Sequence, residues 1–320
     1  MAEPSAADQD RILDAVALSA PGGGDPALAG RALTRTRAER RARLARVVVR
    51  LGLAGIPFLA TIYCALFAPW VAPRDPFEQD LDRRLLPPFF VAGGSMANPL
   101  GTDQIGRDVL SRIIYGARVS LPVGLAATLL GGVVGVLLGA VAGYFRGRVD
   151  RVLTRIMDIQ LSFPFLLFAI SVIALSGPSL RILVVVLAIG SWVGYGRIVR
   201  GMALSLRERE FVQAAQALGA SPMRIVVREV LPNVLPTALV VATLELGRAI
   251  ILEATLSFLG LGVQPPTPTW GTSLSDAREY IQIAWWTATF PGLAIMLVVL
   301  SVNLLGDALR DLLDPRLRLA

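Results

Sequence analysis

Histidine and lysine are both absent from this chain of 320 residues, and cysteine occurs once, at Cys64. Histidine is the commonest general base and the commonest transition-metal ligand in proteins. Its absence excludes Ser-His-Asp catalysis and histidine-ligated metal sites within the chain. A single cysteine cannot form an internal disulfide, and no Ser/Lys or Asp/Asp pair stands out as another reaction centre. We therefore predict no catalytic site, no metal site and no enzymatic activity.

Two sequence signals are also missing. No Gly-Lys-Ser/Thr sequence marks a phosphate-binding loop, so we expect no nucleotide cofactor in the chain itself. No cleavable signal peptide is visible, because the first apolar run follows a long polar arm and exceeds a signal h-region in length. The first thirty residues are rich in Ala, Gly, Pro and Asp, a composition typical of disorder. We interpret the first apolar run as an uncleaved membrane anchor.

Long apolar runs, in contrast, are abundant. Hydrophobic residues make up 54% of the chain and the mean hydropathy is +0.61. A helix crosses the hydrocarbon of a bilayer in about 20 residues, so the sequence predicts an all-α membrane protein with six transmembrane helices. Only a tight turn at Gly177-Pro178 separates the third and fourth, and a hairpin that does not fully cross is the alternative. The six runs lie near Leu51–Val71, Leu121–Tyr144, Ile159–Leu175, Ile182–Val199, Ala238–Gly262 and Thr287–Leu305.

The basic residues are all arginine, and they are unevenly distributed. The N-terminal region, the segments 145–158 and 197–237 and the C-terminus hold 22 of them, whereas the alternate segments hold 8. Cytoplasmic loops carry an excess of arginine, so we expect a multi-pass membrane protein with both termini in the cytoplasm. This topology explains the positive net charge better than nucleic-acid binding does.

The segment between the fourth and fifth spans has a distinctive pattern. Ala214, Ala215 and Leu218 share one side of a short helix by their three-to-four spacing. Gly219 is placed to end this helix in a left-handed conformation, and Pro222 to open a second one. Such a helix–glycine–helix element, small and apolar on one side, suits a groove on another protein. An amphipathic loop on the bilayer surface fits the same spacing equally well.

This segment resembles the EAA loop of ABC importer permeases, whose pattern is Glu-Ala-Ala, three residues, glycine and later Leu-Pro. Glutamine replaces the glutamate here, which removes a charge and any salt bridge made there but leaves the helix and the glycine intact. The resemblance implies that the loop is a cytoplasmic coupling helix that docks into an ATPase subunit. The candidate coupling residues are Gln213, Ala214, Ala215, Leu218, Gly219, Pro222, Leu231 and Pro232.

Three further motifs narrow the resemblance. They begin with Leu100-Gly-Thr-Asp, Leu256-Ser-Phe-Leu-Gly and Leu304-Leu-Gly-Asp. Together the motifs resemble the C-type permeases of dipeptide, oligopeptide and nickel importers, from about the first span to the C-terminus, and imply a type I permease fold. They do not identify the substrate. The implied divisions are a cytoplasmic arm over 1–46, a first helix and extracytoplasmic loop over 47–117, the permease domain over 118–310 and a cytoplasmic tail over 311–320.

The resemblance also implies a location in the bacterial inner membrane, and it implies partners. The chain would form half of a pathway for peptides or a similar small solute, beside a homologous second permease in a heterodimer. Two ATP-binding subunits would hold ATP and Mg²⁺, and an extracytoplasmic solute-binding protein would deliver substrate. A stand-alone ion-coupled transporter or a membrane-embedded enzyme is the alternative. The first leaves the coupling loop unexplained, and the second lacks clustered catalytic groups.

Three ionisable residues, Glu245, Arg248 and Glu253, fall in the fifth span. Charges at membrane depth are costly and face a cavity or a partner. Glu245 and Arg248 are three residues apart, so an internal ion pair is favoured over substrate contact. Glu253 lies around the helix from Arg248, and it needs another partner or the pathway.

Other positions carry structural expectations. Four glycines repeat every fourth residue in the second span, from Gly131 to Gly143, which predicts close packing against another helix. Thr102 or Asp103 is expected to cap the start of a helix in the outer segment 72–120, which we interpret as a small cap over the membrane helices. Trp270 is expected to act as an interfacial anchor.

Overall fold

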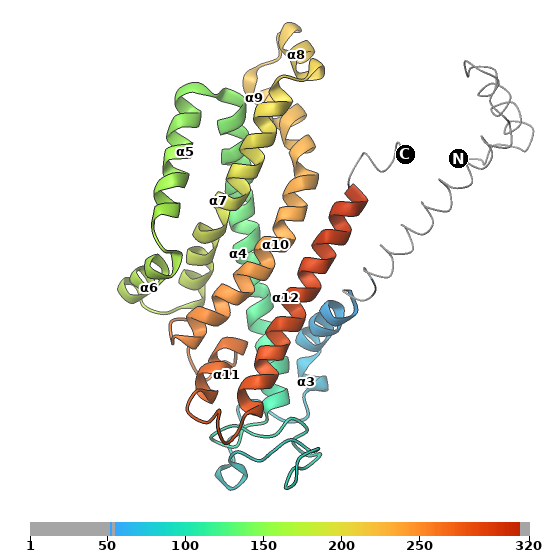
Figure 1. Ribbon diagram of the computed structural model, residues 1–320, viewed down its shortest axis with the longest axis vertical. Coiled ribbons are helices and arrows are strands. Elements are labelled where there is room, and N and C mark those ends of the chain that lie inside the picture. The colour runs from blue at the N-terminus through green and yellow to red at the C-terminus, as the bar shows by residue number, and fades with distance from the viewer. Residues whose placement is uncertain (1–51, 53–54, 314–320) are drawn as a thin grey trace, which may run out of the picture.

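The computed structural model describes residue 52 and residues 55–313, and most of these residues are helical (Figure 1). No strand forms among them beyond an isolated bridge between Thr102 and Asp108, so the all-α prediction is confirmed. The predicted N-terminal arm lies outside the described residues, as does most of the predicted C-terminal tail. The elements are α3 (Ala68–Val71), a 3-10 turn (Leu81–Arg83), α4 (Val109–Phe145), α5 (Gly147–Ser162), α6 (Phe165–Ser176), α7 (Leu180–Arg207), α8 (Glu210–Ala217), α9 (Pro222–Ile225), a π-helical turn (Val226–Val230), α10 (Leu231–Phe258), α11 (Trp270–Ala277) and α12 (Trp286–Leu313).

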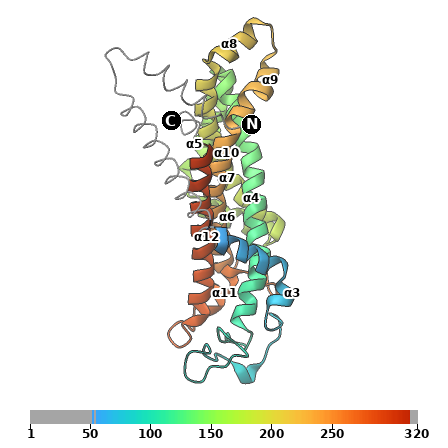
Figure 2. The ribbon, with the colours of Figure 1, turned by 90° about the vertical axis from the view of Figure 1, so that its right-hand side faces the viewer.

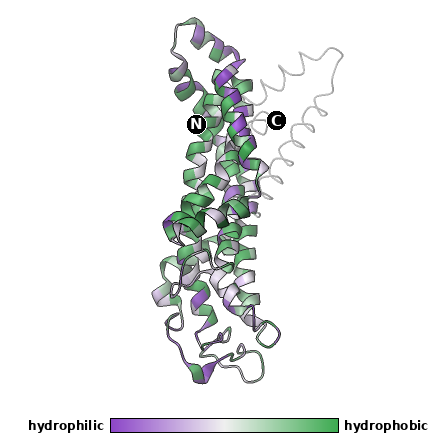
Figure 3. Ribbon diagram, turned by 90° about the vertical axis from the view of Figure 1, so that its left-hand side faces the viewer, coloured by the Kyte–Doolittle hydropathy of each residue, from purple (hydrophilic) through white to green (hydrophobic). Residues whose placement is uncertain are grey.

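Four helical rods in the described part are long and apolar enough to cross a membrane. They are α4, α7, the continuous rod from α9 through α10, and α12. Hydrophobic residues dominate the middle of the bundle, and hydrophilic residues gather toward its two ends (Figure 3). The second, fourth, fifth and sixth predicted spans therefore correspond to real helices, each longer than its apolar run.

The third predicted span is wrong as a straight helix. The chain bends by 87° between α5 and α6, and only the pair together could count as a fifth span. Proline has no backbone N–H and disfavours the helical conformation of the preceding residue. Phe163, directly before Pro164, is accordingly extended at φ −102° and ψ 135°. The first predicted span falls partly outside the described residues, which contain a shorter apolar helix over Gly55–Leu66. The six-helix count is thus not reproduced in the described part.

The centre of the bundle is the contact between α4 and α7. A Cβ added at Gly139 would lie 2.6 Å from the carbonyl oxygen of Gly196, and one at Gly143 would lie 2.5 Å from that of Arg200. Gly131 and Gly135 face backbone carbonyls of α7 as well, those of Ala188 and Trp192. The glycine repeat therefore makes the predicted close-packing face, because only glycine lets the two backbones approach so far.

The two ends of the bundle differ. The junction of α4 with α5 lies at the same end as α8 and α9, whereas α11 and the segment 72–108 lie at the other (Figure 1). The side view shows the segment 72–108 looping beyond the outer ends of α4 and α12 (Figure 2). The described arginine-rich segments therefore converge at the α8 end.

Candidate functional site

The helix–glycine–helix element is present as predicted. Leu218 ends α8, and Gly219 adopts a left-handed conformation with φ +78°. The N–H of Gly219 donates to the carbonyl of Gln216 at 3.0 Å, and the N–H of Ala220 donates to the carbonyl of Ala215 at 3.1 Å. These two bonds form a Schellman motif, in which glycine is favoured because it lacks a Cβ. The motif fixes the angle at which the chain leaves α8.

The second helix of the element opens at Pro222, as predicted. It continues without interruption through the π-helical turn into α10, so Leu231-Pro232 lies inside a single rod rather than at a boundary. Pro232 cannot donate a backbone hydrogen bond. The wider π turn joins the N–H of Leu231 to the carbonyl of Val226 just before this proline. A displacement of the loop would therefore act directly on a membrane helix.

The three residues predicted to share one side of α8 differ in exposure. Leu218 is 88% exposed, and Ala214 is also exposed. Ala215 is half-buried and packs on the cluster that contains Val212 and Ile225. Ala215 also lines a hollow together with Leu218, so the two residues share one side of the loop, with Ala215 at its more buried edge. Gln213 is exposed, and its Nε2 donates to the Glu208 carbonyl at 3.3 Å.

A hollow lies beside this exposed face, between α8 and α9. Its walls combine the apolar Leu218 and Ile225 with the charged Arg224, Arg228 and Glu229. An apolar projection next to a charged hollow is the mixture found at protein interfaces, where an apolar anchor is surrounded by a polar rim.

Side chains at the end of α4 hold the base of α8. The Arg207 guanidinium donates to the Tyr144 carbonyl at 2.8 Å and lies over the Tyr144 ring. Gln216 donates to the Tyr144 hydroxyl at 3.3 Å, and Arg146 pairs with Glu208 at 2.5 Å. The loop is thus attached to α4, α7 and α10 together.

The charged residues of α10 fall into two environments. Arg248 and Glu245 form the predicted pair, with 3.7 Å between Nη1 and Oε1. Glu253 is fully buried and accepts a hydrogen bond of 2.7 Å from Ser257, one turn along the same helix. Its other carboxylate oxygen, Oε2, has no hydrogen-bond donor among the described residues. The buried Ser120 hydroxyl also has no hydrogen-bond partner among them. Glu253 therefore lies in the helix packing and not on an open face.

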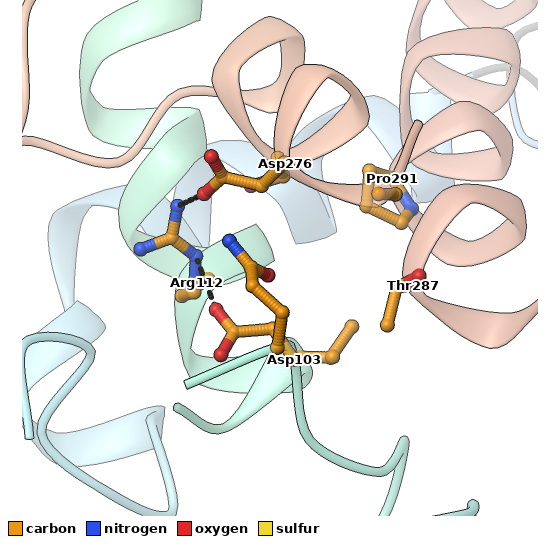
Figure 4. A pocket seen from close by; sticks show the side chains of 9 residues that line it. Asp103, Arg112, Asp276, Thr287 and Pro291 are labelled. Atoms are coloured by element: carbon orange, nitrogen blue, oxygen red, sulfur yellow. Dashed lines mark hydrogen bonds and ion pairs between the residues drawn. The ribbon is translucent and has the colours of Figure 1, made fainter. Parts of the chain in front are cut away.

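An ionic cluster at the outer end was not anticipated from the sequence. Asp276 of α11 accepts from Arg107 at 2.7 Å and from Arg112 of α4 at 3.1 Å, and Asp103 pairs with Arg107 at 2.6 Å. The side chains of Asp103, Arg112 and Asp276 line a small pocket, with Thr287 and Pro291 of α12 on its far side (Figure 4). The cluster joins the outer cap to α4 and α11. The available signal was the presence of arginines in a segment where the positive-inside pattern disfavours them.

Two expectations about this end of the bundle are wrong. The residue that caps α4 is Asp108, whose carboxylate accepts from the Ser111 N–H at 2.8 Å, and not Thr102 or Asp103. Asp103 is engaged by Arg107, and the Thr102 hydroxyl bonds within the cap. Trp270 is completely buried and donates to the Ile113 carbonyl at 3.0 Å. It is a core residue and not an interfacial anchor.

Comparisons with known proteins agree on one kind of protein. The sequence model of the family described as "Binding-protein-dependent transport system inner membrane component" matches residues 135–319. The di/tripeptide transport system permease protein DppC of Pseudomonas aeruginosa is 48% identical over 267 residues, which cover 83% of this chain and 88% of the relative. The dipeptide transport system permease protein DppC of Escherichia coli K12 is 48% identical over 257 residues, 80% of this chain and 86% of the relative.

A solved structure matches the fold. A chain of the MetNI methionine ABC transporter in an inward-facing conformation superposes with a TM-score of 0.51, covering 63% of this chain and 96% of its own length. The sequences are 20% identical, so this likeness concerns the fold alone.

Proposed function

Because the chain belongs to the family of binding-protein-dependent inner-membrane transport components, as the permease subunit of an ATP-driven importer, we propose that it carries dipeptides and tripeptides. The observation that supports this substrate class is the 48% identity, over more than four-fifths of the chain, to permeases named for di/tripeptide and dipeptide transport. The resemblance inferred from the EAA-like loop and the three further motifs is confirmed, and the chain is a transport subunit and not an enzyme.

The coupling loop is the part of the chain that would receive force from ATP hydrolysis. We place the ATPase contact on Leu218, Ala214 and the charged hollow between α8 and α9. A leucine that is 88% exposed outside the membrane helices contributes favourable free energy only when a partner covers it. Gly219 would orient this contact, and Pro222, Leu231 and Pro232 would carry its movement into α10. Gln213 would contribute a neutral hydrogen-bonding group where relatives of this family carry glutamate.

Permeases of this family work with another permease, an ATPase and a binding protein. For this chain we propose a homologous second permease, two ATP-binding subunits that hold ATP and Mg²⁺, and an extracytoplasmic solute-binding protein. An apolar groove between α4 and α10 supports the second permease. It exposes Leu129, Val133, Leu137, Leu235 and Leu239 at membrane depth.

The proposed orientation places the α8 end in the cytoplasm. The arginine-rich segments 145–158 and 197–237 converge at that end, and the positive-inside pattern assigns such an end to the cytoplasm. Both chain termini would then also be cytoplasmic, and the outer cap would face the binding protein. Transport would follow alternating access, in which closure of the ATPases moves the loop and the helix bundles rock.

Reconstituted uptake tests the proposal. The chain is coexpressed with its neighbouring permease and ATPase genes, and the purified complex is placed in vesicles with the binding protein. Uptake of labelled dialanine should require both ATP and the binding protein. Uptake of another solute class under the same conditions, with none of dialanine, would contradict the substrate and leave the permease assignment standing.

A further inference from the structure

Neighbouring helices occupy three faces of α10. Gly247 packs toward Asn303 of α12, because a Cβ added at Gly247 would lie 3.0 Å from the Asn303 Oδ1. Ile250 packs toward Gly124 of α4, where an added Cβ would lie 3.0 Å from the Ile250 Cγ1. Glu245 faces α7, because a Cβ on Gly194 would lie 2.5 Å from its Oε1.

The fourth face of α10 has no covering element in the described part of the chain. Leu244 is 52% exposed, Ile251 is 47% exposed and the Arg248 side chain between them is 49% exposed. These positions share one side of the helix by their three-to-four spacing. Arg248 lies ten residues before the end of α10, which is about 15 Å along the axis at 1.5 Å per residue.

A guanidinium at this depth needs a polar surrounding, because facing lipid hydrocarbon is costly. Its ion-pair contact within the described residues is Glu245, with 3.7 Å between the closest atoms, Nη1 and Oε1. Glu245 is turned inward, with a side chain that is 12% exposed. The guanidinium of Arg248 donates no hydrogen bond to a described residue. Its planar set of N–H donors is therefore free to bind a carboxylate through two parallel hydrogen bonds.

We propose that Arg248 lines the translocation pathway and binds the C-terminal carboxylate of the peptide in transit. This inference rests on the proposed peptide substrate, since a peptide carries the carboxylate that the exposed fork recognises. Glu245 positions the guanidinium from the preceding turn of α10. Leu244 and Ile251 form an apolar surface for the peptide side chains. Arg248 is thus a specificity-determining residue, which favours peptides with a free carboxyl end.

Thiol labelling next to Arg248 tests the location. In a Cys64→Ala background, Leu244→Cys places one thiol on the open face while Arg248 stays in place. In the assembled complex, a hydrophilic thiol reagent should label this cysteine, whereas an Ala249→Cys control, at a buried position, should stay unlabelled. Dialanine at high concentration should slow the labelling, and dialanine amide, which lacks the carboxylate, should not. Protection should disappear in the Arg248→Gln variant.

Uptake tests the role. Arg248→Gln should lower dialanine uptake roughly tenfold or more, as expected for loss of a charged two-point hydrogen bond, with assembly of the complex unchanged. Arg197→Gln is the matched control, because Arg197 is also half-exposed and paired to one acid, Asp158. Its uptake should stay within about twofold of wild type.

Three results would overturn the inference. The cysteine at position 244 could resist the reagent, which would mean that a partner chain covers this face. Dialanine and its amide could protect equally, or Arg248→Gln could transport at the wild-type rate. If the wild-type complex takes up no dipeptide at all, the proposed substrate fails instead.

Discussion

Gly139 of α4 and Gly196 of α7 touch at the level of the backbone. A Cβ on Gly139 would stand 2.6 Å from the Gly196 carbonyl oxygen and 3.1 Å from the Val199 Cβ. Backbone atoms cannot move aside as a flexible side chain can, so the two helices must separate to admit one methyl group. The contact is one of four glycine contacts that bring α4 and α7 together.

Gly139→Ala should therefore destabilise the permease. Overpacking of this kind costs about 1–3 kcal/mol, which thermal unfolding of the purified protein can measure. Gly201→Ala on α7 is the matched control, since a Cβ there meets nothing within 4 Å. The control should be neutral or slightly stabilising, because alanine favours a helix more than glycine does. Equal unfolding temperatures for the two variants would contradict the packing argument.

The sequence predicted the features that depend on local pattern. Apolar runs predicted the four long helical rods, the glycine repeat predicted a close-packing face on α4 without identifying its partner, and Gly219 predicted the turn of the coupling element. Each follows from the period of a helix or from the backbone freedom of glycine. The Glu245–Arg248 pair was predictable for the same reason, since its residues are neighbours on one helix.

Features that depend on distant partners were missed. The apolar run 159–175 continues across Pro164, so its hydropathy concealed the 87° bend. Trp270 was placed at the interface, although Gly116 and Gly271 leave room to bury it between α4 and α10. Asp276 meets Arg107 across 169 positions of sequence, and no local pattern connects them.

The outer ionic cluster gives a second stability prediction. Asp276→Asn removes the carboxylate that contacts both Arg107 and Arg112, and the Arg112 side chain is only 5% exposed. Arg112 keeps its more distant pair with Asp103, 3.7 Å away, but loses its closer acidic partner. This loss at a buried guanidinium should cost about 1–3 kcal/mol, measured by thermal unfolding. The same substitution at Asp158, whose pair with Arg197 is half-exposed, should cost less than about 1 kcal/mol. If Asp276→Asn is as mild as this control, the cluster does not hold the cap.

Membrane orientation is tested by labelling single cysteines in a Cys64→Ala background. Ser95 of the outer cap and Ser221 of the coupling loop are both exposed, and they lie at opposite ends of the bundle. An impermeant thiol reagent added to whole cells should label the Ser95→Cys variant and spare Ser221→Cys. Ser273 is unsuitable as a second outer site because it is buried. Labelling of Ser221→Cys from outside would reverse the proposed orientation.

Copurification of the ATPase with a Leu218→Arg variant tests the central claim most directly. Leu218 is 88% exposed, so the substitution leaves the folded permease intact and changes only the surface offered to a partner. Burying a leucine contributes about 1.5–3 kcal/mol, so ATPase binding should weaken roughly tenfold or more. Ser205→Arg adds the same side chain at an exposed position on α7 and should bind the ATPase normally. ATPase recovery with Leu218→Arg equal to that with Ser205→Arg and wild type would show that this loop is not the coupling element.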